Sequence, residues 1–192
     1  MTNSRPSSYT TADLAYIAVF AALICVLGFF SIPIGGLGVP IVLQNAGIIL
    51  TGLVLGGRRG TLTTCLFLII GIVLPVLAGG RTTLAALAGP TAGYLLGYIL
   101  SAFVAGIIAY QAPEKKLGRI LVFALASIAA VATQYFFGIL GLMWRSSLDF
   151  TAALIAQGPY ILGDIYKLIF VIIIALGVHM AFPDLIRHRS RP

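Results

Sequence analysis

Apolar runs of roughly 20 residues recur along the whole chain, and they limit its possible folds more than any other feature. A helix of about that length can cross the hydrocarbon core of a bilayer. Of the 192 residues, 60% are hydrophobic and only 9% are charged, more apolar surface than a water-soluble domain could bury. We therefore expect an all-α integral membrane protein in which residues 1–192 form a single transmembrane domain in the lipid bilayer.

Stretches rich in glycine, proline or charge divide the chain into six predicted membrane-spanning helices. Their approximate ranges are 12–30, 41–55, 61–77, 91–110, 120–143 and 160–182. Three connections on one side, "SIPIGGLGVP", "AGGRTTLAALAGP" and "WRSSLDFTAALIAQGP", are long, and we expect them to be irregular. Long loops of this kind often shape or cover a binding site, although they can also be ordinary connectors.

The distribution of basic residues predicts the orientation of this bundle. With six spans, one side receives nine of them: Arg5, Arg58, Arg59, Lys115, Lys116, Arg119, Arg187, Arg189 and Arg191. The other side receives only Arg81 and Arg145. Because loops rich in Lys and Arg remain in the cytoplasm, both termini are expected on the cytoplasmic side of the membrane. The net charge of +7 is thus a topology signal, and no nucleic-acid partner is expected.

Sequence signatures of catalysis are missing. The chain has neither the GxxxxGK[ST] pattern of a P-loop nor the HExxH pattern of a zinc protease. Its two histidines, His179 and His188, lie at or beyond the end of the last predicted helix. We therefore expect no catalytic residues, metal site or cofactor, and any ATP hydrolysis should occur in separate subunits.

Two charged residues interrupt the last apolar segment. Asp164 and Lys167 are three residues apart, so their side chains share one helix face. Gly158 and Pro159 mark the external start of this helix, which places both charges in the outer leaflet. Charges facing lipid are costly, so both should face the bundle interior. They form either a structural ion pair or a site for a small ligand that carries N–H groups and a carbonyl or carboxylate.

Four more residues are candidates for the same site. Gln44 and Asn45 begin the second segment on the external side, where they are either interfacial residues or ligand contacts. Arg81 lies in an external loop and is either a solvated charge or a clamp for an anionic group. Tyr94 follows "AGPTAG" and either packs in the core or offers its hydroxyl or ring to a ligand.

On the first helix, Ala18 and Ala22 form an AxxxA spacing that lets another helix approach closely. This pair of small residues alone is a weak signal, because alanine is frequent in membrane helices.

Several stretches together resemble the BioY family, the biotin-specific substrate-capture subunits (S components) of energy-coupling factor (ECF) transporters. They are "VPIVLQNAGIILTGLVLGGRRG", "GIVLPVLAGG", "LAGPTAGYLLGY" and "GPYILGDIYK", and the resemblance covers roughly residues 14–180. "GPTAGY" and "GPYxxGDxxK" are its specific motifs. This chain has Ala92-Gly93 where the family often has two glycines.

The resemblance implies a six-helix fold with a high-affinity biotin site near the external face, in which Asp164 and Lys167 contact biotin. It also implies three partner subunits, a transmembrane scaffold and two cytoplasmic ATPases, with Ala18 and Ala22 docking on the scaffold. Two other functions fit the residues: capture of another small vitamin, and stand-alone secondary transport.

Overall fold

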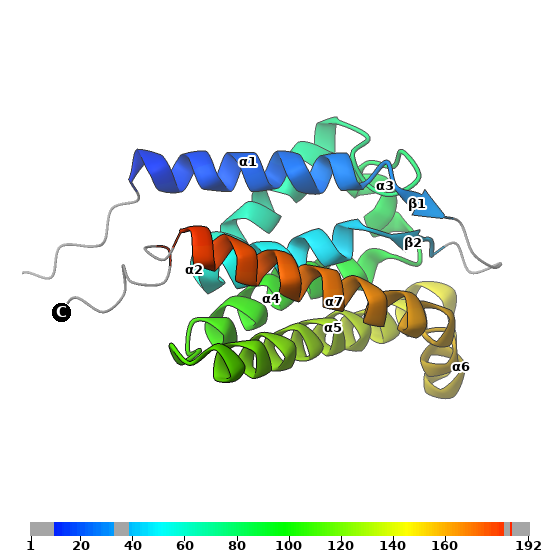
Figure 1. The fold of residues 1–192 in the computed structure, drawn as a ribbon. Coiled ribbons are helices and arrows are strands. Elements are labelled where there is room, and N and C mark those ends of the chain that lie inside the picture. The colour runs from blue at the N-terminus through cyan, green and yellow to red at the C-terminus, as the bar shows by residue number, and fades with distance from the viewer. Residues whose placement is uncertain (1–9, 33–38, 183–184, 186–192) are drawn as a thin grey trace, which may run out of the picture.

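The computed structural model describes residues 10–32, 39–182 and 185, and it consists almost entirely of helices (Figure 1). In chain order its elements are α1 (Thr11–Leu27), β1 (Ser31–Ile32), β2 (Ile41–Val42), α2 (Gln44–Val73), α3 (Thr83–Ala88), α4 (Ala92–Ala109), α5 (Lys116–Ser146), α6 (Phe150–Ile155) and α7 (Gly158–Ala181). The two short strands pair antiparallel. The expected all-α membrane fold is confirmed; Arg5, Arg187, Arg189 and Arg191 lie outside the described residues.

Among the described residues, four helical segments are long and apolar enough to cross a membrane: 44–73, 92–109, 116–146 and 150–181. α1 is apolar but shorter, with 17 residues. α2 consists of two helical arms joined at Gly56. The backbone angles of Gly56, φ 80° and ψ 172°, are not helical and are readily adopted only by glycine. With the arms of α2 taken separately, each of the six predicted segments corresponds to one helix.

Two of the three connections expected to be irregular contain additional helices, whereas most of the first, residues 33–38 of 31–40, lies outside the described residues. α3 begins after Thr82, whose hydroxyl accepts a hydrogen bond from the Ala85 amide at 3.2 Å. α6 begins after Asp149, whose carboxylate accepts from the Ala152 amide at 2.7 Å. These residues are typical helix N-caps, so the sequence did carry the signal. The expectation of irregular loops was wrong here because the Thr82 and Asp149 caps stabilise short helices despite the nearby glycines and prolines.

The first arm of α2 forms the centre of the bundle. Every residue from 44 to 57 is buried, and the arm packs against α1, α4, α5 and α7 (Figure 1). Elsewhere in the bundle, glycines allow helix backbones to approach closely. Gly93 of α4 and Gly141 of α5, for example, face each other. The buried arm therefore serves as a fixed support around which the other helices are arranged.

Two side chains cap the inner end of this arm. Because the helix breaks at Gly56, its last carbonyl groups lose their normal partners within the helix. The Tyr110 hydroxyl donates to the Val54 carbonyl at 2.7 Å, and His179 Nε2 lies 2.9 Å from the Leu53 carbonyl. The caps come from the end of α4 and the end of α7, so three elements meet at the break.

The two ends of the bundle differ. The start of α1, the turn of α2 and the end of α7 lie at one end, and β1, β2, α3 and α6 lie at the other (Figure 1). At the first end, Arg59 in the α2 turn pairs with Asp13 of α1 at 2.7 Å. We call this the inner end and the opposite one the outer end. Arg59 and the start of α1 therefore lie together, as the predicted alternation of spans requires.

Candidate binding site

A cavity opens at the outer end, beside β2 and the first turns of α4 and α7. Its walls carry both hydrogen-bonding and apolar side chains. The polar lining consists of Gln44, Asn45, Arg81, Thr91, Tyr94, Tyr98, Gln134, Tyr135, Tyr160, Asp164 and Lys167, and the apolar lining of Val39, Pro40, Ile41, Val42, Leu77, Ala78 and Leu95. The structure thus brings all six predicted site residues, from four separate regions of the chain, to one cavity.

Asp164 and Lys167 form the charged part of this cavity. α7 begins at Gly158 with proline in its first turn, as the sequence predicts. Lys167 Nζ lies 2.7 Å from Asp164 Oδ1, and the two side chains are 12% and 6% exposed. A buried ion pair of this kind needs further hydrogen bonds to offset the cost of removing both charges from water.

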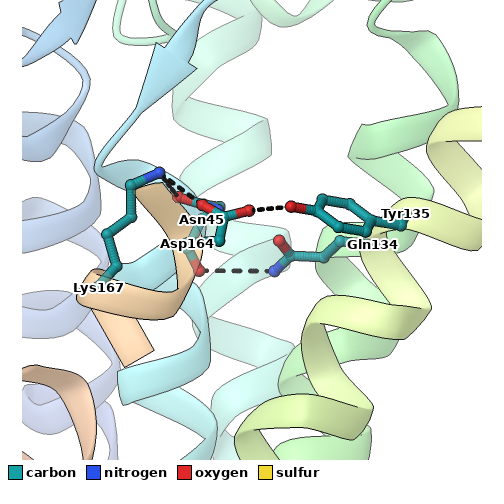
Figure 2. Close-up of polar contacts among 5 residues, drawn as sticks. All are labelled: Asn45, Gln134, Tyr135, Asp164 and Lys167. Atoms are coloured by element: carbon teal, nitrogen blue, oxygen red, sulfur yellow. Dashed lines mark hydrogen bonds and ion pairs between the residues drawn. The ribbon is translucent and has the colours of Figure 1, made fainter. Parts of the chain in front are cut away.

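Asn45 and Tyr135 supply those further hydrogen bonds (Figure 2). Asn45 Nδ2 donates to Asp164 Oδ1 at 3.0 Å, and Lys167 Nζ donates to Asn45 Oδ1 at 3.2 Å. On the other side of the carboxylate, the Tyr135 hydroxyl donates to Asp164 Oδ2 at 2.7 Å. Groups from α2, α5 and α7 therefore hold the carboxylate in one orientation.

Gln44 borders the same cavity but binds the backbone. Its Nε2 donates to the Ile24 carbonyl at 3.1 Å and to the Val76 carbonyl at 2.9 Å. Its Oε1 accepts from the Ala78 amide at 3.0 Å. Both N–H groups are thus used in joining the end of α1, the start of α2 and the connection after α2. These contacts favour a structural role for Gln44 over ligand contact.

Arg81 and Tyr94 lie on the cavity wall with different freedom. Arg81 Nε donates to the Ala78 carbonyl at 3.1 Å, and within the described part of the chain no carboxylate pairs with its guanidinium. The Tyr94 hydroxyl donates to Gln157 Oε1 at 2.6 Å. Arg81 therefore keeps charged N–H groups for an anionic partner, whereas the hydroxyl of Tyr94 already donates to another side chain.

The ion-pair cluster retains unused hydrogen-bonding capacity among the described residues. A carboxylate has about four lone-pair positions, and the hydrogen bonds from Lys167, Asn45 and Tyr135 leave one free on Asp164 Oδ2. An ammonium has three N–H donors, of which Lys167 uses two. The cluster thus offers an acceptor and a donor to a ligand that carries both an N–H and a carbonyl group.

Sequence reasoning missed Gln134, Tyr135 and Tyr160. Gln134 Nε2 donates to Ser101 Oγ at 2.9 Å. It also lies 3.5 Å from the carbonyl of Asn45 (Figure 2). The Tyr160 hydroxyl donates to the Val39 carbonyl at 2.6 Å. A signal for Gln134 existed, because an amide in the middle of an apolar helix is unusual and calls for an internal partner.

A model of the BioY family matches residues 1–184. The chain belongs to the BioY family. The biotin transporter BioY of Rhizobium etli is 36% identical to it over 180 residues, covering 91% of this chain and 96% of that protein. The biotin transporter BioY of Rhodobacter capsulatus is 37% identical over 194 residues, covering 93% of this chain and 98% of that protein. These matches place this BioY chain among transporters rather than enzymes.

A solved structure is similar to this BioY chain over its whole length. The S-component for biotin from an ECF-type ABC transporter superposes with a TM-score of 0.77 at 30% identity, covering 96% of each chain. The similarity to this solved structure and the four membrane-length helices therefore both support a multi-pass membrane fold, as expected for the family.

Ala18 and Ala22 of this BioY chain are exposed on α1, on the side away from its buried face. The buried face consists of Asp13, Ile17, Ala21 and Ile24. The two predicted docking alanines are therefore accessible to lipid or to another helix.

Proposed function

We propose that this BioY protein captures biotin at the outer-end cavity and acts as the S component of an ECF-type uptake transporter. One observation carries the proposal: the Asp164–Lys167–Asn45 cluster offers a free acceptor and a free donor inside a cavity of a BioY fold. The ureido ring of biotin has two N–H donors and one carbonyl acceptor, so the two sets of groups are complementary.

The remaining cavity walls suit the remainder of biotin. Apolar side chains such as Val39, Leu77 and Leu95 provide a surface for the thioether ring and the aliphatic chain. Arg81 carries guanidinium N–H groups with no carboxylate partner among the described residues, which suits the terminal carboxylate. We assign the ureido group to Asp164 and Lys167, with Asn45 beside them, and the carboxylate to Arg81.

Biotin titration of the purified chain tests the proposal. In detergent and free of bound ligand, the protein should release heat on binding biotin and saturate at one ligand per chain. Riboflavin and thiamine in the same titration test the alternative of another vitamin. A chain that gives no response to micromolar biotin, or that prefers either competitor, contradicts the proposed substrate.

The carboxylate assignment has its own test. Biotin amide lacks the anionic carboxylate, so wild-type protein should bind it less tightly than biotin. The Arg81→Gln variant should bind both ligands with similar, weak affinity, because the charge that distinguishes them is gone. If Arg81→Gln still prefers biotin as strongly as wild type, the carboxylate binds elsewhere.

We further propose a division of labour, in which this chain binds the substrate while a scaffold subunit and two ATPases supply the energy. Ala18 and Ala22, exposed on α1, are the proposed contact with the scaffold. Ala18→Leu and Ala22→Leu should abolish co-purification with the scaffold and leave biotin binding intact. Val19→Leu, also exposed on α1, is the matched control. Labelled-biotin uptake that persists without ATPases and collapses with an uncoupler would instead indicate secondary transport.

The proposed orientation has both termini in the cytoplasm and the cavity facing outward. Its support is the charge bias, because Arg58, Arg59, Lys115, Lys116 and Arg119 all fall in or beside inner-end connections. A C-terminal green fluorescent protein should fluoresce, and a C-terminal alkaline phosphatase should be inactive. The reverse pair of results would place the termini outside.

A further inference from the structure

The hydroxyl of Tyr135 lies in the site, but none of the ligand contacts proposed above involves it. Tyr135 lies on α5, is partly buried, and points at Asp164 from the side opposite Lys167 (Figure 2). Its hydroxyl donates to Asp164 Oδ2 at 2.7 Å. A hydroxyl this close to a carboxylate forms a charge-assisted hydrogen bond, which is stronger than one between neutral groups.

The two oxygens of Asp164 have different environments. Oδ1 accepts from both Lys167 Nζ, at 2.7 Å, and Asn45 Nδ2, at 3.0 Å, and these two contacts fill its lone-pair positions. Among the described residues, Oδ2 accepts only from Tyr135. The next N–H group to bind this carboxylate without displacing a protein donor must therefore bind Oδ2.

The orientation of the carboxylate depends on donors at both oxygens. The terminal torsion of an aspartate side chain is broad and has no sharp rotamer preference of its own. Lys167 and Asn45 both donate to Oδ1, so these two hydrogen bonds alone would still allow the plane of the carboxylate to rotate. Tyr135 anchors the second oxygen from a different helix and fixes the plane.

We propose that Tyr135 is a positioning residue that fixes Asp164 so that the remaining lone pair of Oδ2 is directed at one ureido N–H of the ligand. Tyr135 thereby sets the preference for ligands that carry this N–H. The inference rests on the proposed function, because it takes biotin as the ligand. It assigns no ligand contact to Tyr135 itself; the residue acts through Asp164.

Tyr135→Phe, which removes one hydroxyl and keeps the ring, tests this role with four ligands. The ligands are biotin, the two biotins methylated on one or the other ureido nitrogen, and biotin amide. In wild type, one methylated biotin should bind at least tenfold more weakly than biotin, because its N–H is missing. In Tyr135→Phe, the Kd for biotin should rise about 10- to 100-fold, and the penalty for that methylation should shrink several-fold. The penalty for biotin amide should stay unchanged.

Tyr160→Phe and Tyr166→Phe are the matched controls. Tyr160 also lines the cavity and donates one hydrogen bond, but to the Val39 carbonyl, so its loss should not alter the methylation penalty. Tyr166 lies next to Lys167 and is 59% exposed, so its hydroxyl should be irrelevant to every ligand. If Tyr135→Phe does not fold, difluorotyrosine at position 135 replaces it: a stronger donor should increase the methylation penalty.

The outcomes separate this inference from the proposed function. A wild-type protein that fails to bind biotin overturns both. A wild type that binds biotin, with a methylation penalty that Tyr135→Phe leaves unchanged, overturns the role of Tyr135 alone. The same holds if Tyr135→Phe weakens all four ligands equally. A wild type that penalises neither methylated biotin overturns the role of Tyr135 and also the assignment of the ureido group to Asp164, while biotin capture itself stands.

Discussion

Asn45 Nδ2 donates a hydrogen bond to Asp164 Oδ1 at 3.0 Å, across 119 residues of sequence. Asn45 lies in the first turn of the buried arm of α2, and Asp164 lies near the start of α7. At the inner end of the same two helices, His179 of α7 lies 2.9 Å from the Leu53 carbonyl of α2. α7 is therefore attached to the central arm by polar contacts at both ends, and its outer attachment is the candidate binding site.

Replacement of Asp164 by asparagine should damage both binding and stability. The variant leaves the Lys167 ammonium buried without its carboxylate, which costs about 3–5 kcal/mol when such a pair is fully buried. We expect loss of biotin binding in titration and a lower thermal unfolding midpoint. The double variant Asp164→Asn/Lys167→Met removes the unpaired charge, so it should recover much of the midpoint without recovering binding. Recovery of binding in the double variant would show that the pair is only structural.

Gln44→Leu should act on the fold rather than on the ligand. It removes three hydrogen bonds and leaves the Ile24 and Val76 carbonyls and the Ala78 amide without this partner. Each unsatisfied buried group costs about 1–3 kcal/mol, so the thermal midpoint should fall by many degrees. Gln111→Leu is the control, because the Gln111 side chain donates its hydrogen bond to the Ile107 carbonyl at the exposed surface. Equal midpoints for the two variants would contradict the structural role of Gln44.

His179→Phe should weaken the inner end of the bundle. Phenylalanine can keep the ring contacts with Phe123 and Tyr110 but cannot donate to the Leu53 carbonyl. We expect a loss of about 1–3 kcal/mol from the free energy of unfolding. Met180→Leu, at a neighbouring position that is 71% exposed, should be neutral in the same chemical denaturation experiment. A His179→Phe variant as stable as Met180→Leu would mean that the cap contributes nothing.

Gly141→Ala should disrupt the contact between α4 and α5. A Cβ atom at Gly141 would lie 2.5 Å from the Gly93 amide nitrogen and 2.7 Å from its Cα, and a backbone cannot move aside as a flexible side chain can. The cost should be at least about 1–3 kcal/mol, visible as a lower thermal midpoint or poor expression. At Gly177 of α7 a Cβ meets no heavy atom within 4 Å, so Gly177→Ala should be neutral or slightly stabilising. The prediction fails if both alanines behave alike.

Local sequence patterns were sufficient to predict the long helices and to predict that Asp164 and Lys167 share one helix face. The break between the second and third predicted segments falls at Gly56, within the glycine-rich stretch that suggested it. The spacing of Asp164 and Lys167 predicted a common face, and the two side chains are in contact at 2.7 Å. The caps Thr82 and Asp149 were equally readable, although their helices were not predicted.

The roles of Gln44 and Asn45 could not be separated from the sequence. The two amides are adjacent, polar and both placed at the start of one helix. Successive residues of a helix point about 100° apart. In the folded chain this rotation turns Gln44 toward the backbone of α1 and the connection after α2, and Asn45 toward Asp164.

The sequence by itself determined that this chain is a membrane-embedded helical bundle with a charged pair facing inward. Those properties follow from length, hydropathy and spacing, because hydrocarbon accepts only helices with satisfied backbones and excludes unpaired charge. Only the tertiary structure decided which groups surround that pair. Asn45 is separated from Asp164 by 119 positions in the sequence, and Tyr135 by 29 positions. No local sequence pattern encodes which buried donors meet once the helices pack.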